Sequence, residues 1–285
     1  MKIVKDVVND QERAFYAFEN TNFQNIKIQG PADGESAFKE CDSIVVEDSL
    51  LDLRYPFWHN NYLAINNSKL TLNCRAALWY STNITMNESL IEGVKAYREC
   101  KNIKVSNSKI ISPEVFWFCR DINMRDCYVE GEYAFFKGEN LEIHNLNFKG
   151  KYSFQYAKNI TIYDSYLDTK DAFWHAEKVT VYNSTITGAY FAWYAKEVKL
   201  VNCKIIGTQP ICYADNIILE NCTMEDADFA FEYSTVYANL LGEVISVKNP
   251  YKGYIHAERI RKIITDKNAK EDSDVEIIAN NKNIA

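Results

Sequence analysis

A repeat of nineteen residues constrains this chain more than any other feature of its sequence. Val179, Val198 and Ile217 stand nineteen residues apart, and the interval continues on both sides with one longer gap of twenty-one residues. This first apolar column comprises Ile44, Leu63, Ile84, Ile103, Ile122, Leu141, Ile160, Val179, Val198, Ile217 and Val236. Such a fixed period predicts a solenoid, in which each repeat buries its apolar face by stacking on its neighbours.

Within each repeat, short segments alternate between apolar and polar residues, as half-buried strands do. Four residues after the first column comes Asn or Asp in nearly every repeat, as at Asn183, and these residues tolerate the left-handed backbone of a tight turn. Glycine recurs at a second turn, as at Gly188, and phenylalanine recurs in a third segment, as at Phe173. We therefore predict an all-β fold: a single-stranded right-handed parallel β-helix of about 11 rungs with three short strands per rung. A leucine-rich repeat is disfavoured because its Leu-x-x-Leu-x-Leu signature and its helices are missing.

The sequence of the repeats resembles that of one known family. The segments AFEYSTV at 230–236 and SVKNP at 246–250, together with the repeats themselves, are similar to the bacterial family catalogued as domain of unknown function 3737. The likeness covers nearly the whole chain. It implies a right-handed β-helix in a soluble bacterial protein, and it implies no catalytic residues.

The repeat also predicts the organisation of the chain. We expect residues 1–36 to form an N-terminal cap with a partial first rung, because a bare terminal rung would expose strand edges. Residues 37–236 carry the repeats. Residues 237–285 lose the nineteen-residue spacing, so we expect closing strands and a tail there.

Composition narrows the class of protein. A net charge of −7 disfavours nucleic acid as a partner, since its binders carry a basic face. No apolar stretch is long enough for a signal peptide or a membrane span, so we expect a cytoplasmic protein. Six of the eight cysteines fall in columns of small residues, which predicts buried free thiols. No CxxC or HExxH spacing occurs, and neither a metal nor a cofactor is expected.

The aromatic residues of the third segment are arranged in columns. All five tryptophans share one column, which Phe136 and Phe231 continue. The next column contains rings interspersed with charged residues: His59, Tyr80, Phe118, Tyr156, His175, Tyr194 and Tyr213, with Glu40, Glu99, Lys137 and Glu232. Both columns could be core ladders. The uniformly apolar phenylalanine column before them is the better candidate for the interior, which would leave the tryptophans facing outward as a binding surface.

The candidate site lies late in the chain, where polar rings follow one another in consecutive rungs. Its predicted residues are Tyr156, Trp174, His175, Trp193, Tyr194, Tyr213 and Glu232. Tryptophan platforms beside polar groups are typical of a ligand site. Glu232 lies among apolar residues and either has a raised pKa or anchors the C-terminal cap by accepting hydrogen bonds.

Two classes of function fit this surface. The first is a binding protein whose aromatic strip holds an oligosaccharide, a protein partner or a second copy of the chain as a homodimer. The alternative is a carbohydrate-active enzyme, a polysaccharide lyase or a glycoside hydrolase, which would also require paired carboxylates or calcium with a base. We expect no membrane partner.

Overall fold

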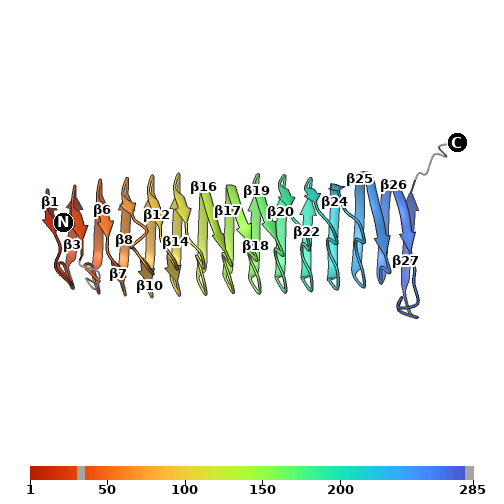
Figure 1. Ribbon diagram of the computed structural model, residues 1–285, viewed down its shortest axis with the longest axis horizontal. Helices are drawn as coiled ribbons and strands as arrows, with labels where there is room; N and C mark the ends of the chain where they lie inside the picture. The colour runs from red at the N-terminus through yellow and green to blue at the C-terminus, as the bar shows by residue number, and fades with distance from the viewer. Residues whose placement is uncertain (31–35, 280–285) are drawn as a thin grey trace. The chain divides into compact units, whose positions relative to one another are not determined.

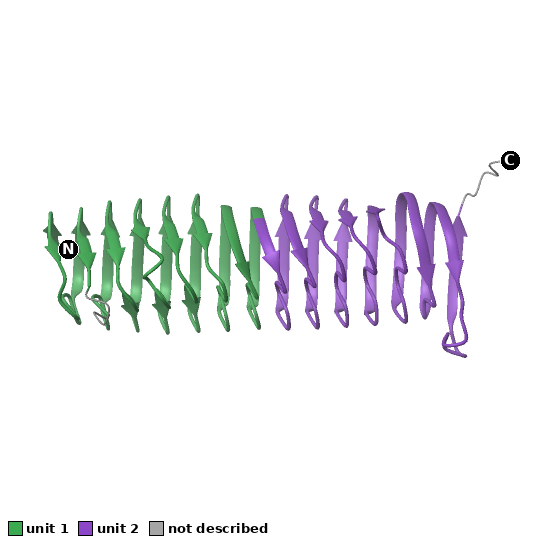
Figure 2. Ribbon diagram, in the orientation of Figure 1, with its two compact units in different colours: residues 1–147 green, residues 148–285 purple. Residues whose placement is uncertain are grey.

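The computed structural model describes residues 1–30 and 36–279 and divides into two compact units, residues 1–147 and 148–285 (Figure 2). Within each unit, parallel strands lie side by side in chain order (Figure 1). Register partners stand nineteen residues apart through most of the repeats, as with Val179 and Val198. The described residues form no helix, and the predicted parallel β-helix is confirmed.

In unit 1, each rung begins with a longer strand and continues with a shorter one. The first strands are β1 (Lys2–Lys5), β3 (Glu19–Gln24), β5 (Asp42–Glu47), β8 (Asn61–Asn66), β11 (Thr82–Asn87) and β14 (Lys101–Ser106). The second strands are β2 (Val8–Asn9), β4 (Lys27–Gln29), β6 (Leu50–Asp52), β9 (Lys69–Leu70), β12 (Leu90–Glu92) and β15 (Lys109–Ile111). In β16 (Arg120–Glu132) both run on as one strand, and β17 (Glu139–Lys151) contains residues of both units.

Unit 2 repeats the same pattern. Its first strands are β18 (Lys158–Tyr163), β20 (Glu177–Tyr182) and β22 (Lys196–Val201), and its second strands are β19 (Tyr166–Lys170), β21 (Thr185–Thr187) and β23 (Lys204–Ile206). The unit ends with the long strands β24 (Asp215–Glu225), β25 (Thr235–Lys248) and β26 (Lys252–Ile264), followed by the shorter β27 (Asp274–Ala279).

The third segment differs between the units. It forms short strands in three rungs of unit 1, β7 (Phe57–Trp58), β10 (Leu78–Trp79) and β13 (Tyr97–Arg98). In unit 2 it is a run of turns, in which left-handed residues such as Phe173 (φ 59°) and His175 (φ 55°) alternate with others. Ala172, Phe173 and Ala176 are buried there, so the segment still closes the rung.

The fold has about 14 turns instead of the 11 expected. Residues 2–29 already form paired strands, and three strands follow Thr235. Other intervals join these terminal turns to the repeats: Thr21 and Ile44 are register partners twenty-three residues apart, whereas Val236 and Gly253 are seventeen apart. Columns extended outward from the repeats therefore miss them, although Lys2 and Thr21 are again nineteen residues apart.

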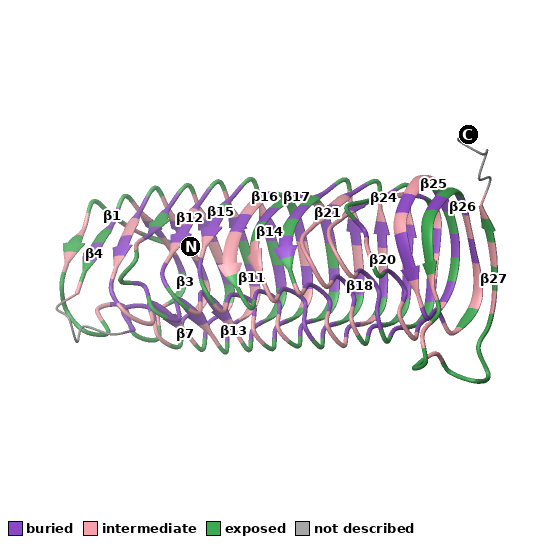
Figure 3. Ribbon diagram, turned by 45° about the vertical axis from the view of Figure 1, so that its right-hand side comes forward, coloured by how far each residue is buried: buried purple, intermediate pink, exposed green. Residues whose placement is uncertain are grey.

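The phenylalanine column is the interior, as predicted. Phe38, Phe57, Phe116, Phe135, Phe154 and Phe173 are all 0 % exposed. In unit 2 the rings of Phe154 and Phe173 stack with centroids 4.7 Å apart. Figure 3 shows buried and exposed positions alternating along the strands. Burying one such ring contributes roughly 1.5–3 kcal/mol, so this column is a major source of stability.

The turns have the predicted chemistry. Asn183 adopts φ 50°, and its Nδ2 donates to Asp164 Oδ1 of the preceding rung at 3.1 Å. At the second turn Gly188 adopts φ +133°, and a Cβ there would lie 2.4 Å from the carbonyl oxygen of Thr169. Backbones of neighbouring rungs approach so closely that only glycine fits.

Candidate functional site

The structure brings four predicted site residues of unit 2 into one stack of rings. The ring centroids of Tyr156 and His175 are 4.9 Å apart, those of His175 and Tyr194 4.9 Å, and those of Tyr194 and Tyr213 5.0 Å. The planes of successive rings deviate by 9°, 11° and 14°. Each residue adopts a left-handed conformation at equivalent points of successive rungs, so the strand spacing sets the ring spacing. Tyr233 continues the stack at 5.5 Å with a tilt of 40°. We call these five residues the unit 2 ladder.

Stacking determines what the unit 2 ladder presents to solvent. Neighbouring rings cover one another's faces, so the outward surface consists of ring edges and polar tips. Tyr156 is 43 % exposed, and Tyr194 and Tyr213 are each 37 % exposed. A tyrosine hydroxyl both donates and accepts hydrogen bonds. The ladder therefore offers a row of polar groups spaced by one rung.

Trp174 and Trp193 lie beside the ladder and are half-buried. The indole of Trp174 is 17° from the plane of His175, with centroids 5.8 Å apart. Trp193 Nε1 donates to the carbonyl oxygen of Gln209 at 2.7 Å, whereas the buried Nε1 of Trp174 has no partner among the described residues. The tryptophan column thus lies neither in the interior nor fully in solvent.

The expectation that Glu232 shares the ring column was wrong. The amide of Tyr213 donates to Glu232 O, whereas that of Tyr194 donates to Cys212 O, so Glu232 follows Cys212 in the tryptophan column. Tyr233 occupies the ring column, and Phe231, expected beside the tryptophans, lies in the core at 0 % exposure. One residue is inserted near Ala227 and one is missing before Val236. Because the two changes cancel, the interval from Ile217 to Val236 stays nineteen and hides the shift.

Glu232 is ion-paired. Lys248 Nζ, at the end of β25, lies 2.7 Å from Glu232 Oε1, and the glutamate side chain is 12 % exposed. The hydrogen bond to Glu232 raises the pKa of Lys248. Burial, followed by the charge of Glu232, raises the pKa of Tyr213. This geometry agrees with the second of the two predicted roles, an anchor for the C-terminal strands.

Other carboxylates around the ladder also have cationic partners. Glu177 Oε2 lies 2.9 Å from Lys158 Nζ, and Asp171 Oδ2 lies 3.8 Å from Lys170 Nζ. Burial raises the pKa of Asp171, and burial together with the nearby Lys196 lowers the pKa of His175. In the described part of the chain, no group of three or more His, Cys, Asp or Glu residues could hold a metal ion.

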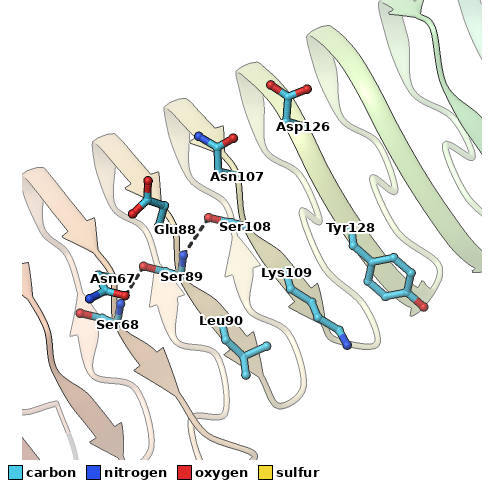
Figure 4. Close-up of a pocket in the computed structure, with 10 residues that line it drawn as sticks. All are labelled: Asn67, Ser68, Glu88, Ser89, Leu90, Asn107, Ser108, Lys109, Asp126 and Tyr128. Carbon is cyan, nitrogen blue, oxygen red and sulfur yellow. Dashed lines mark hydrogen bonds between the residues drawn. The ribbon is translucent and has the colours of Figure 1, made fainter.

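Unit 1 has a shallow hollow of about 630 Å³ along the corner that follows each first strand, where Asn67, Glu88, Asn107 and Asp126 lie (Figure 4). The amide of Ser68 donates to Ser89 Oγ at 3.0 Å, and that of Ser89 donates to Ser108 Oγ at 3.1 Å. The Lys109 ammonium lies over the Tyr128 ring at 5.2 Å. These polar groups bind one another along the rungs, which identifies the corner as a structural feature.

A second hollow of unit 1, about 810 Å³, was not predicted. Its lining combines aromatic and charged side chains with two cysteines. Its lining comprises Tyr80, Thr82, Arg98, Glu99, Cys100, Lys101, Phe118, Cys119, Arg120, Lys137 and Glu139. The sequence contained a signal for it, because Glu99 interrupts the ring column between Tyr80 and Phe118. We call this feature the unit 1 hollow.

Comparison with known families identifies the group to which this architecture belongs. The family described as "Protein of unknown function (DUF3737)" matches residues 2–278, nearly the whole chain. The chain belongs to this family. The resemblance noted in the repeats and in the segment 230–236 is thereby confirmed.

Comparison with curated proteins found no match to this DUF3737 chain. Among solved structures it is similar to PfbA, a surface adhesin of Streptococcus pneumoniae, with 9 % identity, a TM-score of 0.45 and coverage of 94 % of this chain and 86 % of that one. It is also similar to the A-module of the mannuronan C-5 epimerase AlgE4 of Azotobacter vinelandii, with 9 % identity, a TM-score of 0.35 and coverage of 97 % and 86 %. Each likeness concerns the fold alone. Within the described residues, no helix is long and apolar enough to cross a membrane.

Proposed function

We propose that this protein is a binding protein and that the unit 2 ladder, with Trp174 and Trp193 beside it, holds a linear oligosaccharide. The observation that carries this proposal is the regular spacing of the polar tips along the ladder, with successive centroids 4.9, 4.9 and 5.0 Å apart. A ligand that repeats along its own length can make the same contact at each rung. Sugar hydroxyls both donate and accept hydrogen bonds, as the tyrosine hydroxyls do.

The electrostatics of unit 2 support binding over catalysis. A glycoside hydrolase places two carboxyl groups on either side of the bond that is cleaved, one protonated and one ionised or nucleophilic. Around the ladder, Glu177 and Glu232 instead form close ion pairs with Lys158 and Lys248. Such carboxylates hold the rungs together and have cationic partners instead of a water or substrate to activate.

A protein partner or a second copy of the chain is the competing occupant of the same surface, since exposed tyrosine and tryptophan are enriched in protein interfaces.

We also propose that the protein works in a reducing compartment, the cytoplasm. All eight cysteines are buried free thiols, which supports this assignment.

The test compares two pairs of stacked tyrosines in unit 2. The double variant Tyr194→Phe/Tyr213→Phe retains the rings and removes two hydroxyls from the ladder. We expect it to unfold like the wild type and to bind roughly tenfold more weakly to whichever linear oligosaccharide the wild type selects from a panel, measured by calorimetry. The matched control is Tyr163→Phe/Tyr182→Phe. The rings of this pair also stack, with centroids 5.1 Å apart, but they belong to a different column from the ladder.

The control pair should bind oligosaccharide like the wild type. Equal loss of binding in both pairs, or no binding of any oligosaccharide by the wild type, contradicts the proposal. If the wild type binds none and its sedimentation shows self-association that the ladder variant loses, the surface is a homodimer face.

A further inference from the structure

The unit 1 hollow is formed by an interruption in a ring ladder. His59 and Tyr80 stack with centroids 5.1 Å apart, and the next rung places Glu99 where a third ring would lie. Phe118 follows one rung later, so its backbone position is two rungs from that of Tyr80, or roughly 9.6 Å. Aromatic pairs stack at centroid separations of roughly 4.5–7 Å. This separation is wide enough for one additional ring between Tyr80 and Phe118, beside the Arg98 guanidinium, whose carbon lies 6.0 Å from the centroid of the Phe118 ring.

Both walls of this slot reach solvent. Tyr80 is 38 % exposed and Phe118 is 40 % exposed. The Glu99 carboxylate is directed to one side, where Oε1 lies 3.7 Å from Arg98 Nε. The volume of the hollow, about 810 Å³, falls in the range of small-molecule sites.

The charge of the hollow is the opposite of that of the chain. Its lining contains four cations and two carboxylates, a surplus of two positive charges in a protein of net charge −7. Lys101, Arg120 and Lys137 form no ion pair among the described residues, and Lys137 Nζ lies over the Phe118 ring at 5.7 Å. Concave surfaces lined by one sign of charge concentrate counter-ions.

The corresponding rungs of unit 2 show that this surplus is unusual. Lys101 and Arg120 are register partners at the start of β14 and β16, so two cations lie side by side. The corresponding column in unit 2 alternates in sign through Lys158, Glu177, Lys196 and Asp215. Like charges directly opposite in a sheet are destabilising, and a bound anion would relieve the repulsion.

From these observations we infer that the unit 1 hollow is a binding site for a small anion that carries a ring, with the ring between Tyr80 and Phe118 and the anionic group against Lys101 and Arg120. The site is separate from the unit 2 ladder and does not rest on the function proposed for it. Two sources share this chemistry, a sugar acid and an aromatic acid. In both, ring stacking and charge pairing act together.

The experiment is a calorimetric titration of the full chain at low salt with trigalacturonate and with 4-hydroxybenzoate. Galactose supplies a ring without charge, and acetate supplies the charge without a ring. We expect one of the two ring-bearing anions to bind at a single site at least about tenfold more tightly than either control, and the stronger of the two identifies the source. No binding by either, or equal binding of acetate, overturns the inference.

Two variants of Glu99 separate the effect of filling the slot from the effect of removing the negative charge. Glu99→Tyr fills the slot with a ring at a position where tyrosine is already accepted, as at Tyr80, and we expect it to abolish binding without loss of stability. Glu99→Gln leaves the slot open and removes a negative charge, so it should bind at least as tightly as the wild type. Undiminished binding by Glu99→Tyr contradicts the proposed position of the ring.

A second pair of variants tests the adjacent cations. Arg120→Gln removes one of the two adjacent cations, so we expect at least about tenfold weaker binding of the anion without loss of the fold, which the melting temperature checks. Lys196→Gln in the alternating column of unit 2 should leave anion binding unchanged. If Arg120→Gln binds like the wild type, the inference fails.

Discussion

The imidazole of His175 stacks on the phenol ring of Tyr194 with centroids 4.9 Å apart and planes 11° apart. Tyr156 covers the other face of the same imidazole at 4.9 Å. A histidine held between two rings interacts through its faces, and its burial and the charge of Lys196 lower its pKa. The imidazole thus serves as a planar element of the unit 2 ladder.

His175→Ala should remove the stacked pairs with Tyr156 and Tyr194, besides the more distant contact with Trp174, and destabilise the protein. Each aromatic pair contributes roughly 0.5–1.5 kcal/mol beyond its buried area, so we expect a loss of about 1–3 kcal/mol in the free energy of unfolding. His175→Phe retains a planar ring and should cost less than about 1 kcal/mol. Urea unfolding of the two variants measures the difference, and equal losses would show that stacking does not stabilise this column.

Gly188→Ala should be among the most damaging single substitutions in unit 2. The new Cβ would lie 2.4 Å from the carbonyl oxygen of Thr169 at a backbone φ of +133°. We expect destabilisation by at least about 3 kcal/mol, because neighbouring rungs must move apart. Gly242→Ala is the matched control: its φ is +76°, but nothing lies within 4 Å of its Cβ. It should cost roughly 1 kcal/mol, and an equal loss at the two positions would refute the steric explanation.

Stability should decrease in alkaline solution because of the buried thiols. Burial raises the pKa values of Cys41, Cys74 and Cys212 to about 12 from an ordinary value of 9.0. Since these folded-state values lie above those of the unfolded chain, their contribution is complete below pH 9 and is lost as the pH rises from 9 towards 12. At pH 10 each thiol should cost about 1 kcal/mol.

Denaturant midpoints at pH 7 and pH 10 measure this effect, and Cys74→Ala provides the control. The alanine variant should lose less stability between the two pH values than the wild type, because one thiol with a raised pKa is gone. A pH dependence identical in the two proteins would show that the slope arises elsewhere.

Glu232→Gln should weaken the attachment of the C-terminal strands. The change removes the closer of the two carboxylate partners of Lys248, the other being Asp266, at a site where the glutamate side chain is 12 % exposed, and we expect a loss of about 1–3 kcal/mol. The control is Glu220→Gln, whose ion pair with Lys199 is exposed to solvent, so its loss should have a smaller effect on stability. Loss of oligosaccharide binding by Glu232→Gln with unchanged stability would instead assign the residue to the site.

The sequence by itself determined the repeating unit and its interior. In a parallel β-helix, residues at equivalent points of successive rungs share one environment, so a period in sequence is also a column in space. For this reason the phenylalanine column, the left-handed turn at Asn183 and the glycine at position 188 could be assigned from spacing alone. The stack from Tyr156 to Tyr213 followed from the same rule.

Only the tertiary structure showed where the nineteen-residue period does not give the position of a residue in its rung. The insertion near Ala227 cancels against the residue missing before Val236, so Glu232 and Tyr233 exchanged columns without a change in the interval at Ile217. The terminal turns were hidden because intervals of twenty-three and seventeen residues join them to the repeats. The unit 1 hollow depends on side chains from several rungs that converge around a replaced ring, and the width of such a slot is a property of packing that one-dimensional spacing does not contain.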